Sequence, residues 1–548
     1  MSVELKEYHA PVWNEPVILE MGYPGRRGVL FPQTEAAIQD RIGDAFELIP
    51  PALRRQDKPA LPEMSEPEVL YHYLRLSQQT LGMMGISLFG TCTMKYNPQI
   101  NEALAWRPEL TELHPLQHED TMQGTLEIVH NMDLILREIS GMDQFVFQAG
   151  GGAEAAFTSC AVIRAYHAAR GELEQRDEII TTIATHPCNP STAAAAGFKV
   201  ITLMLDENGY PSLDALKAAV SNRTAAIMVN NPDDMGVYNP EIKEWIRIVH
   251  EAGGLAFYDS ANLNGTMSKI RARDIGFDAC MFMLHKTFGA PKSGVGGPAT
   301  GAYGCSAALA PFLPAPLVTR EGERYRLDHD RPQSVGKIRE FLGNIQVVLK
   351  AYAWARAMGA EGIAQASDIS VLGNNYMEKG LLAIRGVTRS HPDAKLPRLE
   401  MTRYSLETMK EETGVSVHDV QNRMSDFGID PIWSSHEPWL VPEPFTPEAG
   451  EMYGKEALDR WIAVLARISD EAYSSPEIVT TSPHNQGTHR LKPGETDDPS
   501  TRAMTWRAFQ KKRAQTAKQP ASRGKRLASV TVTPALAFMD AESLPVIT

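Results

Sequence analysis

Apolar positions from residue 122 onwards first have the spacing of a helix and then change between the patterns of strands and of helices. From Met122 to Ile139 they recur every three or four residues and stop before Gly141, which predicts a helix that ends at this glycine. Short runs of β-branched and aromatic residues then alternate with helical patterns. The runs predict strands over residues 144–148, 178–184, 199–205, 225–231, 255–259 and 279–284, and the patterns between them predict helices over 153–171, 191–198, from Leu213 and over 240–254.

This alternation predicts the fold class and a division of the chain into parts. Strands separated by helices are typical of a mostly parallel sheet covered on both faces, so we expect a large α/β domain over residues 111–345. Residues 1–110 are expected to form an N-terminal arm with helices, and residues 346–500 a smaller α+β domain. Helices of these outer parts are predicted from the capping-box pair Ser65 and Glu68 and over 414–431 and 456–473.

Residues 501–548 are predicted to form a basic tail. Between Lys511 and Arg526 the sequence holds seven basic residues and no acidic one, a composition typical of a solvated, disordered segment. An arm that binds RNA or a protein partner is the alternative interpretation of the same charges.

Composition limits the class of protein. The chain has 548 residues, 43% hydrophobic and 22% charged, with a net charge of -13, as in ordinary soluble globular proteins. An acidic balance disfavours nucleic acid or an anionic membrane as the main partner. The first residues lack the apolar run of a signal peptide, and no segment has the length of a membrane span, so we expect a cytoplasmic protein. The five cysteines are scattered, and we expect neither a disulfide nor a structural zinc ion.

Chemically useful residues follow four of the predicted strands. In open α/β sheets, ligands bind beyond the carboxyl ends of the strands. The segment "AGGGAE" follows the first predicted strand and "THPCNP", with His186, follows the second. Asp259 ends the fifth, and Lys286 follows the sixth. The glycine run opens a helix, whose backbone N–H groups and positive dipole end suit a phosphate group.

These parts match the needs of pyridoxal 5'-phosphate. A lysine forms the Schiff base, a carboxylate keeps the pyridine nitrogen protonated, an imidazole stacks on the ring, and the phosphate needs an anchor. Each signal alone has an ordinary explanation: Lys286 as a surface charge, Asp259 as a helix cap, His186 as a loop histidine and the glycines as a tight turn. Their joint placement after four strands favours the cofactor.

Several longer motifs carry a resemblance to a known family. They include "TCTMKYNPQINE", "ELHPLQHEDTMQGTLEI", "IVHEAGGLAFYDSANLNG" and "DIGFDACMFMLHKTF". The sequence resembles the glycine dehydrogenases (decarboxylating) of the glycine cleavage system, in the form of the second subunit of the two-subunit enzyme. The resemblance implies the fold-type-I architecture of aminotransferases and the cofactor pyridoxal 5'-phosphate. It also implies decarboxylation of glycine, with transfer of the remaining aminomethyl group to the lipoyl arm of a carrier protein.

The resemblance assigns residues to the cofactor. Lys286 matches the lysine that binds the cofactor, His186 the histidine that stacks on its ring and Asp259 the partner of its pyridine nitrogen. Ala261 matches the small residue beneath the ring. The phosphate is expected at Gly151, Gly152 and Ala153.

The resemblance also implies a substrate side and partners. Thr93, Tyr96 and His114 lie in segments that border the substrate in the family. A homologue of subunit 1 is the expected partner, in an assembly with two copies of each subunit, together with the lipoyl carrier protein.

The sequence departs from the family pattern near these residues. After Lys286 the family writes a glycine-rich "TPHGGGGPGSGP" type of loop, where this chain has "APKSGVGGPATG", with Lys292 in place of a histidine. Side chains in such a loop are expected to reshape the substrate channel. Lys292 is expected either to pair with a substrate carboxylate or with the carrier, or to point into solvent. The phosphate loop and the segment "LPRLEMTRYSLETMK" also differ.

Three functions therefore stay open at the level of sequence. The leading one is subunit 2 of glycine dehydrogenase (decarboxylating). The second is a divergent decarboxylase, lyase or aminotransferase that uses pyridoxal 5'-phosphate on another amino acid without a lipoyl carrier. The third is a non-catalytic scaffold, which the presence of Lys286, Asp259 and His186 argues against, because a scaffold needs no nucleophile.

Overall fold

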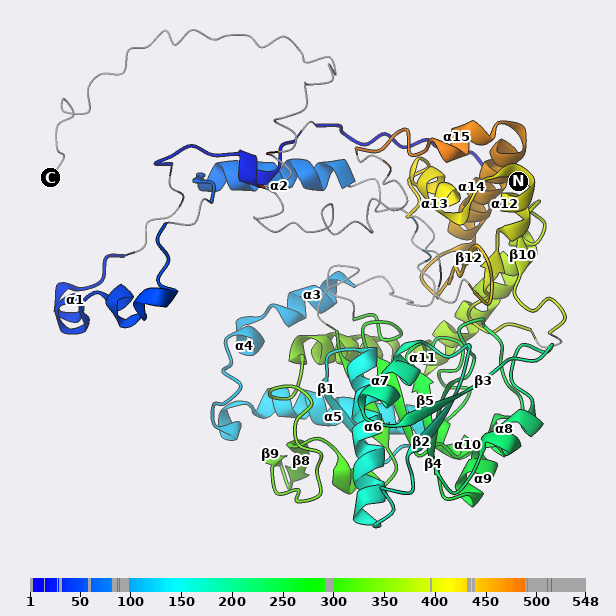
Figure 1. The fold of residues 1–548 in the computed structure, drawn as a ribbon, viewed down its shortest axis with the longest axis horizontal. Coiled ribbons are helices and arrows are strands. Elements are labelled where there is room, and N and C mark those ends of the chain that lie inside the picture. The colour runs from blue at the N-terminus through cyan, green and yellow to red at the C-terminus, as the bar shows by residue number, and fades with distance from the viewer. Residues whose placement is uncertain are drawn as a thin grey trace, which may run out of the picture. The chain divides into compact units, whose positions relative to one another are not determined.

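A seven-stranded sheet, built from strands between residues 144 and 305, is the main sheet of the computed structural model (Figure 1). The strand order is β1-β7-β6-β5-β4-β2-β3. The pairs β2–β3, β2–β4, β4–β5 and β5–β6 are parallel, whereas β7 is antiparallel to both of its neighbours, β1 and β6. The mostly parallel α/β sheet predicted from the sequence is therefore confirmed. The strands are β1 (Gln144–Ala149), β2 (Glu178–Thr182), β3 (Lys199–Leu203), β4 (Thr224–Asn230), β5 (Leu255–Ser260), β6 (Ala279–Met283) and β7 (Gly301–Cys305).

The structure describes most of the chain up to residue 490. The described residues are 3–13, 15–26, 28, 32–57, 61–80, 86, 88, 98–290, 299–394, 397–430, 435, 439–487, 490, 510 and 514.

Helices cover both faces of the sheet. On one face, α5 (Gln123–Ser140), α9 (Ile242–Glu251) and the first part of α11 (Ile345–Leu381) pack into one apolar cluster. On the other face, α6 (Gly152–Ala169) and α7 (Cys188–Ala195) pack into a second cluster. Strand β5 explains why the strands read as continuous apolar runs: Tyr258 belongs to the first cluster and Phe257 to the second. Helix α8 (Leu213–Ala219) adds Leu216 to the first cluster.

The pattern failed to predict strand β7. The strand reads "GAYGC", too short and too rich in glycine to stand out. Its glycines have a packing reason, because a side chain at Gly304 would collide with the ring of Phe145, and one at Gly301 would lie 2.7 Å from the carbonyl oxygen of Gly151. Close approach to neighbouring segments therefore decides the residues of β7.

The C-terminal part of the chain has its own apolar cluster. Met377 and Leu381, near the end of α11, join this cluster, whereas the beginning of α11 packs against the large sheet. The helix bends at Gly359, which has a φ of 62°. The predicted helices over 414–431 and 456–473 are confirmed as α13 and α14. The elements here are β10 (Thr388–Arg389), β11 (Tyr404–Ser405), β12 (Pro444–Phe445), α12 (Glu407–Thr413), α13 (Val417–Ser425), α14 (Lys455–Ser474) and α15 (Pro476–Thr480).

Short elements precede and flank the large sheet. Helix α2 begins next to Ser65, whose backbone N–H donates to the carboxylate of Glu68 at 2.8 Å, as the capping-box spacing predicted. The remaining elements are α1 (Ala36–Ile42), α2 (Glu66–Thr80), α3 (Gln99–Ala105), α4 (Pro108–Thr111), α10 (Ala272–Ile275), β8 (Leu317–Glu321), β9 (Arg324–Asp328) and the 3-10 helices over Ile18–Glu20, Ala45–Leu48, Pro51–Leu53, Glu119–Thr121 and Ala310–Phe312.

The chain divides into two compact units, residues 1–489 and 490–548. The predicted basic tail falls in the second unit, and almost all of it lies outside the described residues. The domain boundaries near residues 110 and 345 stay predictions. Across the part of the chain that the structure describes, no helix is both long and apolar enough to cross a membrane.

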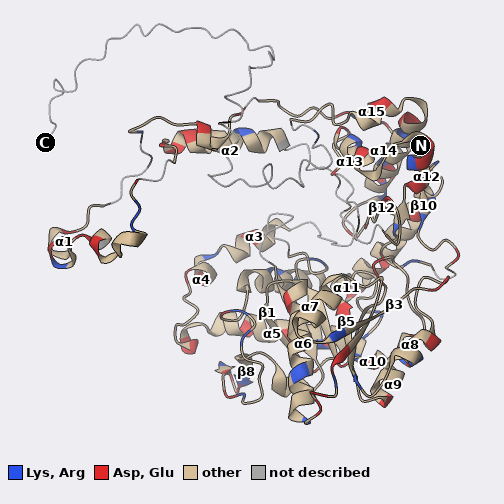
Figure 2. Cartoon of the chain, in the orientation of Figure 1, with Lys and Arg blue, Asp and Glu red and all other residues tan. Residues whose placement is uncertain are grey.

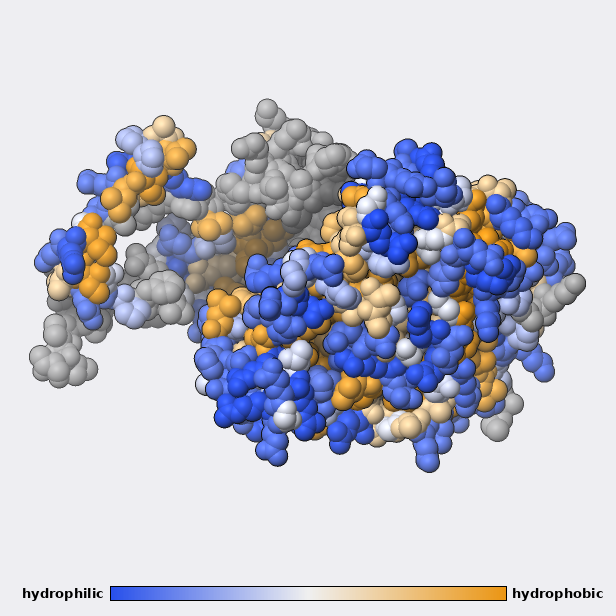
Figure 3. Space-filling view, turned by 90° about the horizontal axis from the view of Figure 1, so that it is seen from below, coloured by the Kyte–Doolittle hydropathy of each residue, from blue (hydrophilic) through white to orange (hydrophobic). Residues whose placement is uncertain are grey.

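Polar and charged residues dominate the visible surface. Acidic and basic residues are interspersed along the helices and loops in Figure 2. The face drawn in Figure 3 is largely hydrophilic, with hydrophobic patches between the polar residues.

Candidate functional site

The carboxyl ends of three parallel strands meet at one small cavity. Asp259 is the penultimate residue of β5, Lys286 lies three residues after the end of β6 and His186 four residues after the end of β2, and all three line this cavity. Ala261 lines it as well. The structure therefore brings together the lysine, the carboxylate, the imidazole and the small residue that the sequence singled out.

Asp259 is a buried carboxylate with fixed hydrogen-bond donors. Its side chain accepts a hydrogen bond from Asn189 Nδ2 at 2.9 Å and another from the backbone N–H of Ala261 at 3.0 Å. Burial raises the pKa of Asp259, while the neighbouring His186, the amide of Asn189 and Lys286 act in the opposite direction. A positively charged ring nitrogen placed beside this carboxylate would stabilise its charged form further.

Asn189 and Asn230 complete the surroundings of Asp259. Asn189 Nδ2 also lies 3.0 Å from Thr185 Oγ1, and the hydroxyl of Thr185 donates to Asn230 Oδ1. Sequence reasoning missed both asparagines. The signal was present, because Asn189 stands in the same "THPCNP" segment as His186 and Asn230 ends β4, but loop asparagines are commonly turn formers.

The imidazole of His186 is oriented by backbone contacts. Its Nδ1 accepts a hydrogen bond from the backbone N–H of Cys188 at 3.1 Å, so in the neutral ring the proton sits on Nε2. The backbone N–H of His186 donates to Asn230 Oδ1 at 3.2 Å. Asn230 also pairs with Asp259 between β4 and β5, so it connects the segments that carry His186 and Asp259.

Lys286 is buried in a tight turn after β6. It is 7% exposed, and its backbone N–H donates to the carbonyl oxygen of Met283 at 3.0 Å. The next residue, Thr287, accepts a hydrogen bond on Oγ1 from the backbone N–H of Leu263 at 2.9 Å. Burial, with a smaller contribution from Lys286, lowers the pKa of His285 to about 4, so this imidazole is neutral at pH 7. Because Lys286 is buried, its interpretation as a surface charge is wrong.

The N-terminus of α6 offers an open set of backbone donors. Gly151 stands at the N-cap without a capping side chain, and a side chain there would meet no atom within 4 Å. Gly152 and Ala153 form the first turn, in which the carboxylate of Glu154 accepts from the backbone N–H of Gly150 at 2.7 Å.

This cradle does not line the cavity of Lys286, but it lies next to the same strand. A side chain at Gly152 would be 3.7 Å from the sulfur of Met283, the last residue of β6. Gly151 thus leaves open space beside the strand that leads to Lys286, whereas the side chains of Arg339 and Glu154 lie close to Gly150. Together with buried Asp259 and the oriented imidazole of His186, the donor set fits pyridoxal 5'-phosphate.

Glu400 is a further carboxyl group that lines the cavity. It is 2% exposed, and among the described residues its Oε2 has no hydrogen-bond partner. Burial raises the pKa of Glu400 to about 7. A side chain at Gly265 would occupy the space of this carboxyl group. The sequence interpretation noted that this segment differs from the family but did not single out Glu400.

The predicted substrate residues have mixed outcomes. Thr93, Tyr96 and Lys292 lie outside the described residues. His114 is exposed and does not line the cavity; its Nδ1 accepts from the backbone N–H of Leu116 at 3.1 Å. Its role in substrate binding therefore stays a prediction.

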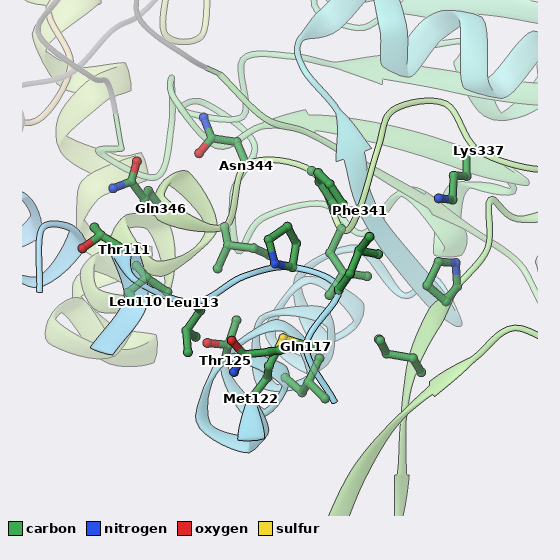
Figure 4. A pocket seen from close by; sticks show the side chains of 18 of the residues that line it. Leu110, Thr111, Leu113, Gln117, Met122, Thr125, Lys337, Phe341, Asn344 and Gln346 are labelled. Atoms are coloured by element: carbon green, nitrogen blue, oxygen red, sulfur yellow. The ribbon is translucent and has the colours of Figure 1, made fainter. Parts of the chain in front are cut away.

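A larger pocket lies apart from these residues (Figure 4). Its volume is about 630 Å³, and apolar residues such as Leu110, Met122 and Phe341 line most of it, with Lys337 at one end and Gln346 at the other. Neither Lys286 nor Asp259 belongs to its wall. Over the described part of the chain, no cluster of three or more His, Cys, Asp or Glu side chains could hold a metal ion.

Comparison with known proteins gives the family. Residues 138–309 match the family model of class-V aminotransferases. The probable glycine dehydrogenase (decarboxylating) subunit 2 of Thermococcus kodakarensis is 43% identical over 508 residues, which cover 92% of this chain and 98% of that protein. The protein of the same name from Staphylococcus haemolyticus is 38% identical over 483 residues, 87% of this chain and 95% of that protein.

Solved structures agree on the fold. A crystal structure described as glycine decarboxylase (P-protein) of the glycine cleavage system matches 80% of this chain and 99% of that chain, with a TM-score of 0.66 and 20% identity. The cysteine desulfurase CsdA from Escherichia coli matches 72% of this chain and 96% of that one, with a TM-score of 0.54 and 16% identity. At these identities the structures show a shared fold. Identity of about two fifths to relatives that are matched almost end to end shows more: the chain belongs to the family of glycine dehydrogenase (decarboxylating) subunit 2 proteins.

Proposed function

We propose that this chain binds pyridoxal 5'-phosphate through Lys286 and acts as subunit 2 of a glycine dehydrogenase (decarboxylating). In this reaction the carboxylate of glycine leaves as CO2, and the aminomethyl group passes to the lipoyl arm of a carrier protein. The observation that carries the proposal is the convergence of Lys286, Asp259 and His186 on one cavity in a chain of this family.

The cofactor, when bound, supplies a conjugated ring that accepts the electron pair left when CO2 departs. The residues of the chain provide the rest. Lys286 Nζ would hold the cofactor and, when free, would move protons at the reacting carbon of the substrate. His186 would stack on the ring, and Ala261, a small residue in the wall of the same cavity, would leave space for it.

Asp259 holds a proton on the ring nitrogen. A carboxylate in a buried site interacts strongly with a neighbouring positive charge, because little water screens the pair. The hydrogen bonds from Asn189 and from the backbone of Ala261 keep the carboxylate in place and favour its charged form. The phosphate would bind at Gly151, Gly152 and Ala153.

Partners follow from the same proposal. The relatives are named subunit 2, which supports a partner homologous to subunit 1. We propose two copies of each subunit and a lipoyl carrier protein as acceptor. His114, Thr93, Tyr96 and Lys292 are the proposed residues of the substrate side, and an unchanged KM for glycine after Lys292→Ala would remove Lys292 from this group.

The first test is a glycine–bicarbonate carboxyl exchange assay. The purified chain, loaded with pyridoxal 5'-phosphate, is measured alone and together with subunit 1 and the lipoyl carrier. Exchange that requires the added proteins supports the proposal. A bound cofactor without exchange in any combination would favour the divergent enzyme acting on another amino acid.

The second test addresses Lys286 directly. Lys286→Ala should abolish the visible absorbance of the lysine-bound cofactor and lower the exchange rate by at least about 1,000-fold, because Lys286 is the only lysine among the described residues that line the cavity. Lys217→Ala, which removes a lysine that is 53% exposed on α8, is the matched control and should behave like the unmodified protein. Visible absorbance that persists in Lys286→Ala would contradict the assignment.

A further inference from the structure

The turn that carries Lys286 is fixed from several sides. Thr287 is held by the backbone of Leu263, and the ring of Phe288 packs edge-on against Trp354 with 5.8 Å between the ring centroids. Gly289 ends the turn with a φ of 58°, and a side chain there would lie 2.7 Å from the Trp354 ring. The backbone therefore passes close to α11 directly after Lys286.

The carbonyl group of Gly289 is held by a side chain from a distant part of the sequence. Asn101 Nδ2 donates a hydrogen bond to the Gly289 oxygen at 2.9 Å, and Asn101 is 1% exposed. A buried carbonyl needs a donor, since water cannot replace a lost partner there. The amide of Asn101 thus stabilises the turn at the end opposite to Thr287.

Asn101 is itself held in place. It lies on α3, where the neighbouring Glu102 forms an ion pair with the buried Lys350 of α11. At the end of α3, Gln346 Nε2 donates to the carbonyl oxygen of Ala105 at 2.9 Å. Two contacts with α11 therefore hold α3 and place the donor group of Asn101 against the Gly289 carbonyl.

We propose that Asn101 is a positioning residue for the cofactor lysine. It locks the backbone from Lys286 to Gly289 against α3 and so fixes where Lys286 Nζ can reach. The inference rests on the proposed role of Lys286.

The test uses the holoenzyme with its partner proteins. Asn101→Ala removes the donor, and Asn101→Ser keeps a shorter hydroxyl that can reach the Gly289 carbonyl through a water molecule. The exchange kcat should fall roughly 10-fold in Asn101→Ala and less in Asn101→Ser, with KM changed less than about twofold, because small misplacement of a reacting group slows the chemical step.

A spectroscopic readout separates positioning from general weakening. The pH midpoint at which the absorbance of the lysine-bound cofactor changes should shift by about half a unit or more in Asn101→Ala. The titratable side chains that share the cavity with Lys286 stay the same in every variant, so the shift reports a change at the lysine. These side chains are His186, Asp234, Tyr258, Asp259 and Glu400.

Gln346→Ala is the matched control. It also loosens α3, but at the end that does not contact the turn. Its absorbance midpoint and kcat should change much less than those of Asn101→Ala, because the Asn101 donor and the ion pair between Glu102 and Lys350 remain. If Asn101→Ala does not fold, the kcat and the absorbance midpoint of Asn101→Ser are compared with those of Gln346→Ala instead.

Asn101 variants that behave like Gln346→Ala would overturn the inference. A failure of the proposed function looks different, because the unmodified protein would then show no absorbance of a lysine-bound cofactor at all.

Discussion

Two carboxyl groups in the candidate cavity differ in how their burial is compensated. Asp259 accepts hydrogen bonds from Asn189 and from the backbone of Ala261. Glu400 is equally buried, but among the described residues its Oε2 has no partner. An uncompensated buried carboxylate is costly, so Glu400 resists ionisation and its pKa rises to about 7.

Glu400→Gln should change the pH dependence of stability. A raised pKa means that the folded state binds the proton more tightly than the unfolded state, so Glu400 favours folding at low pH and loses this contribution as pH rises towards 7. The glutamine variant has no ionisation cost. Its free energy of unfolding relative to the unmodified protein should therefore increase by about 2 to 3 kcal/mol between pH 5 and pH 8.

Urea unfolding of the cofactor-free protein at several pH values measures this difference. Glu378→Gln is a suitable comparison, because Glu378 already pairs with Arg389 at 2.6 Å and accepts from Thr402 at 2.9 Å. Parallel pH curves for the unmodified protein and Glu400→Gln would contradict the expectation.

Asn189→Ala should weaken the proposed role of Asp259. Without the amide donor the carboxylate loses part of what favours its charged form, and its pKa rises further. The exchange rate is expected to fall roughly 10-fold, most strongly at low pH, because the protonated acid no longer stabilises the charged ring nitrogen. A pH–rate profile checks this.

Ser191→Ala is the control for Asn189. Ser191 lies on the same helix, α7, and its hydroxyl donates only to the carbonyl oxygen of Pro187 at 2.8 Å. Equal rates for Asn189→Ala and Ser191→Ala would show that the contact with Asp259 does not matter for the reaction.

At the scale of elements, two glycines in tight turns differ in how closely their surroundings pack against them. Gly289 has a φ of 58° and lies against the Trp354 ring, whereas Gly322, in the hairpin between β8 and β9, has a φ of 62° and open space around it. The two positions share the backbone conformation and differ in the neighbour. Alanine substitutions at the two positions therefore allow the free-energy cost of the left-handed backbone to be distinguished from the cost of a collision with a neighbouring side chain.

Gly289→Ala should destabilise the protein more than Gly322→Ala. The backbone conformation costs of the order of 1 kcal/mol at both positions, and the collision with Trp354 adds about 1 to 3 kcal/mol at Gly289. Thermal and urea unfolding compare the two variants. Similar losses of stability at both sites would mean that the Trp354 contact relaxes without cost.

The elements that were predicted are those with a strong repeating pattern. Helix α5 and its C-terminal Gly141 follow from spacing alone, and Gly141 has the expected left-handed conformation, with a φ of 75°. Strand β7 has no such pattern, because its partners β1 and β6 supply the packing. Helix α11 was missed because its first part faces the large sheet and its end faces the C-terminal cluster.

At the scale of the whole molecule, α11 connects two apolar cores. The first core includes Val348 and Ala355 from α11, and the second includes Met377 and Leu381. The predicted boundary near residue 345 falls where this helix begins, so a cut there would remove a wall of the first core.

Removal of residues 501–548 should leave the enzyme intact. The boundary between the two compact units falls after residue 489 in the sequence, and all residues of the candidate site belong to the first unit. The unfolding temperature and the exchange rate of the shortened chain should match those of the full chain within about 1 °C and about twofold. A large loss of activity with unchanged stability would favour a partner-binding arm.

The sequence by itself determined the α/β class, the order of the parallel strands along the chain and the choice of Lys286, Asp259 and His186. These follow from local rules: apolar spacing predicts strands and helices, and ligands bind where parallel strands end. Only the tertiary structure decided which polar groups surround those residues. Asn101 and Glu400 reach the turn and the cavity from segments far away in sequence, and no local pattern encodes that proximity. The burial of each ionisable side chain in the cavity then influences its charge, and the extent of that burial depends on all the segments packed around it.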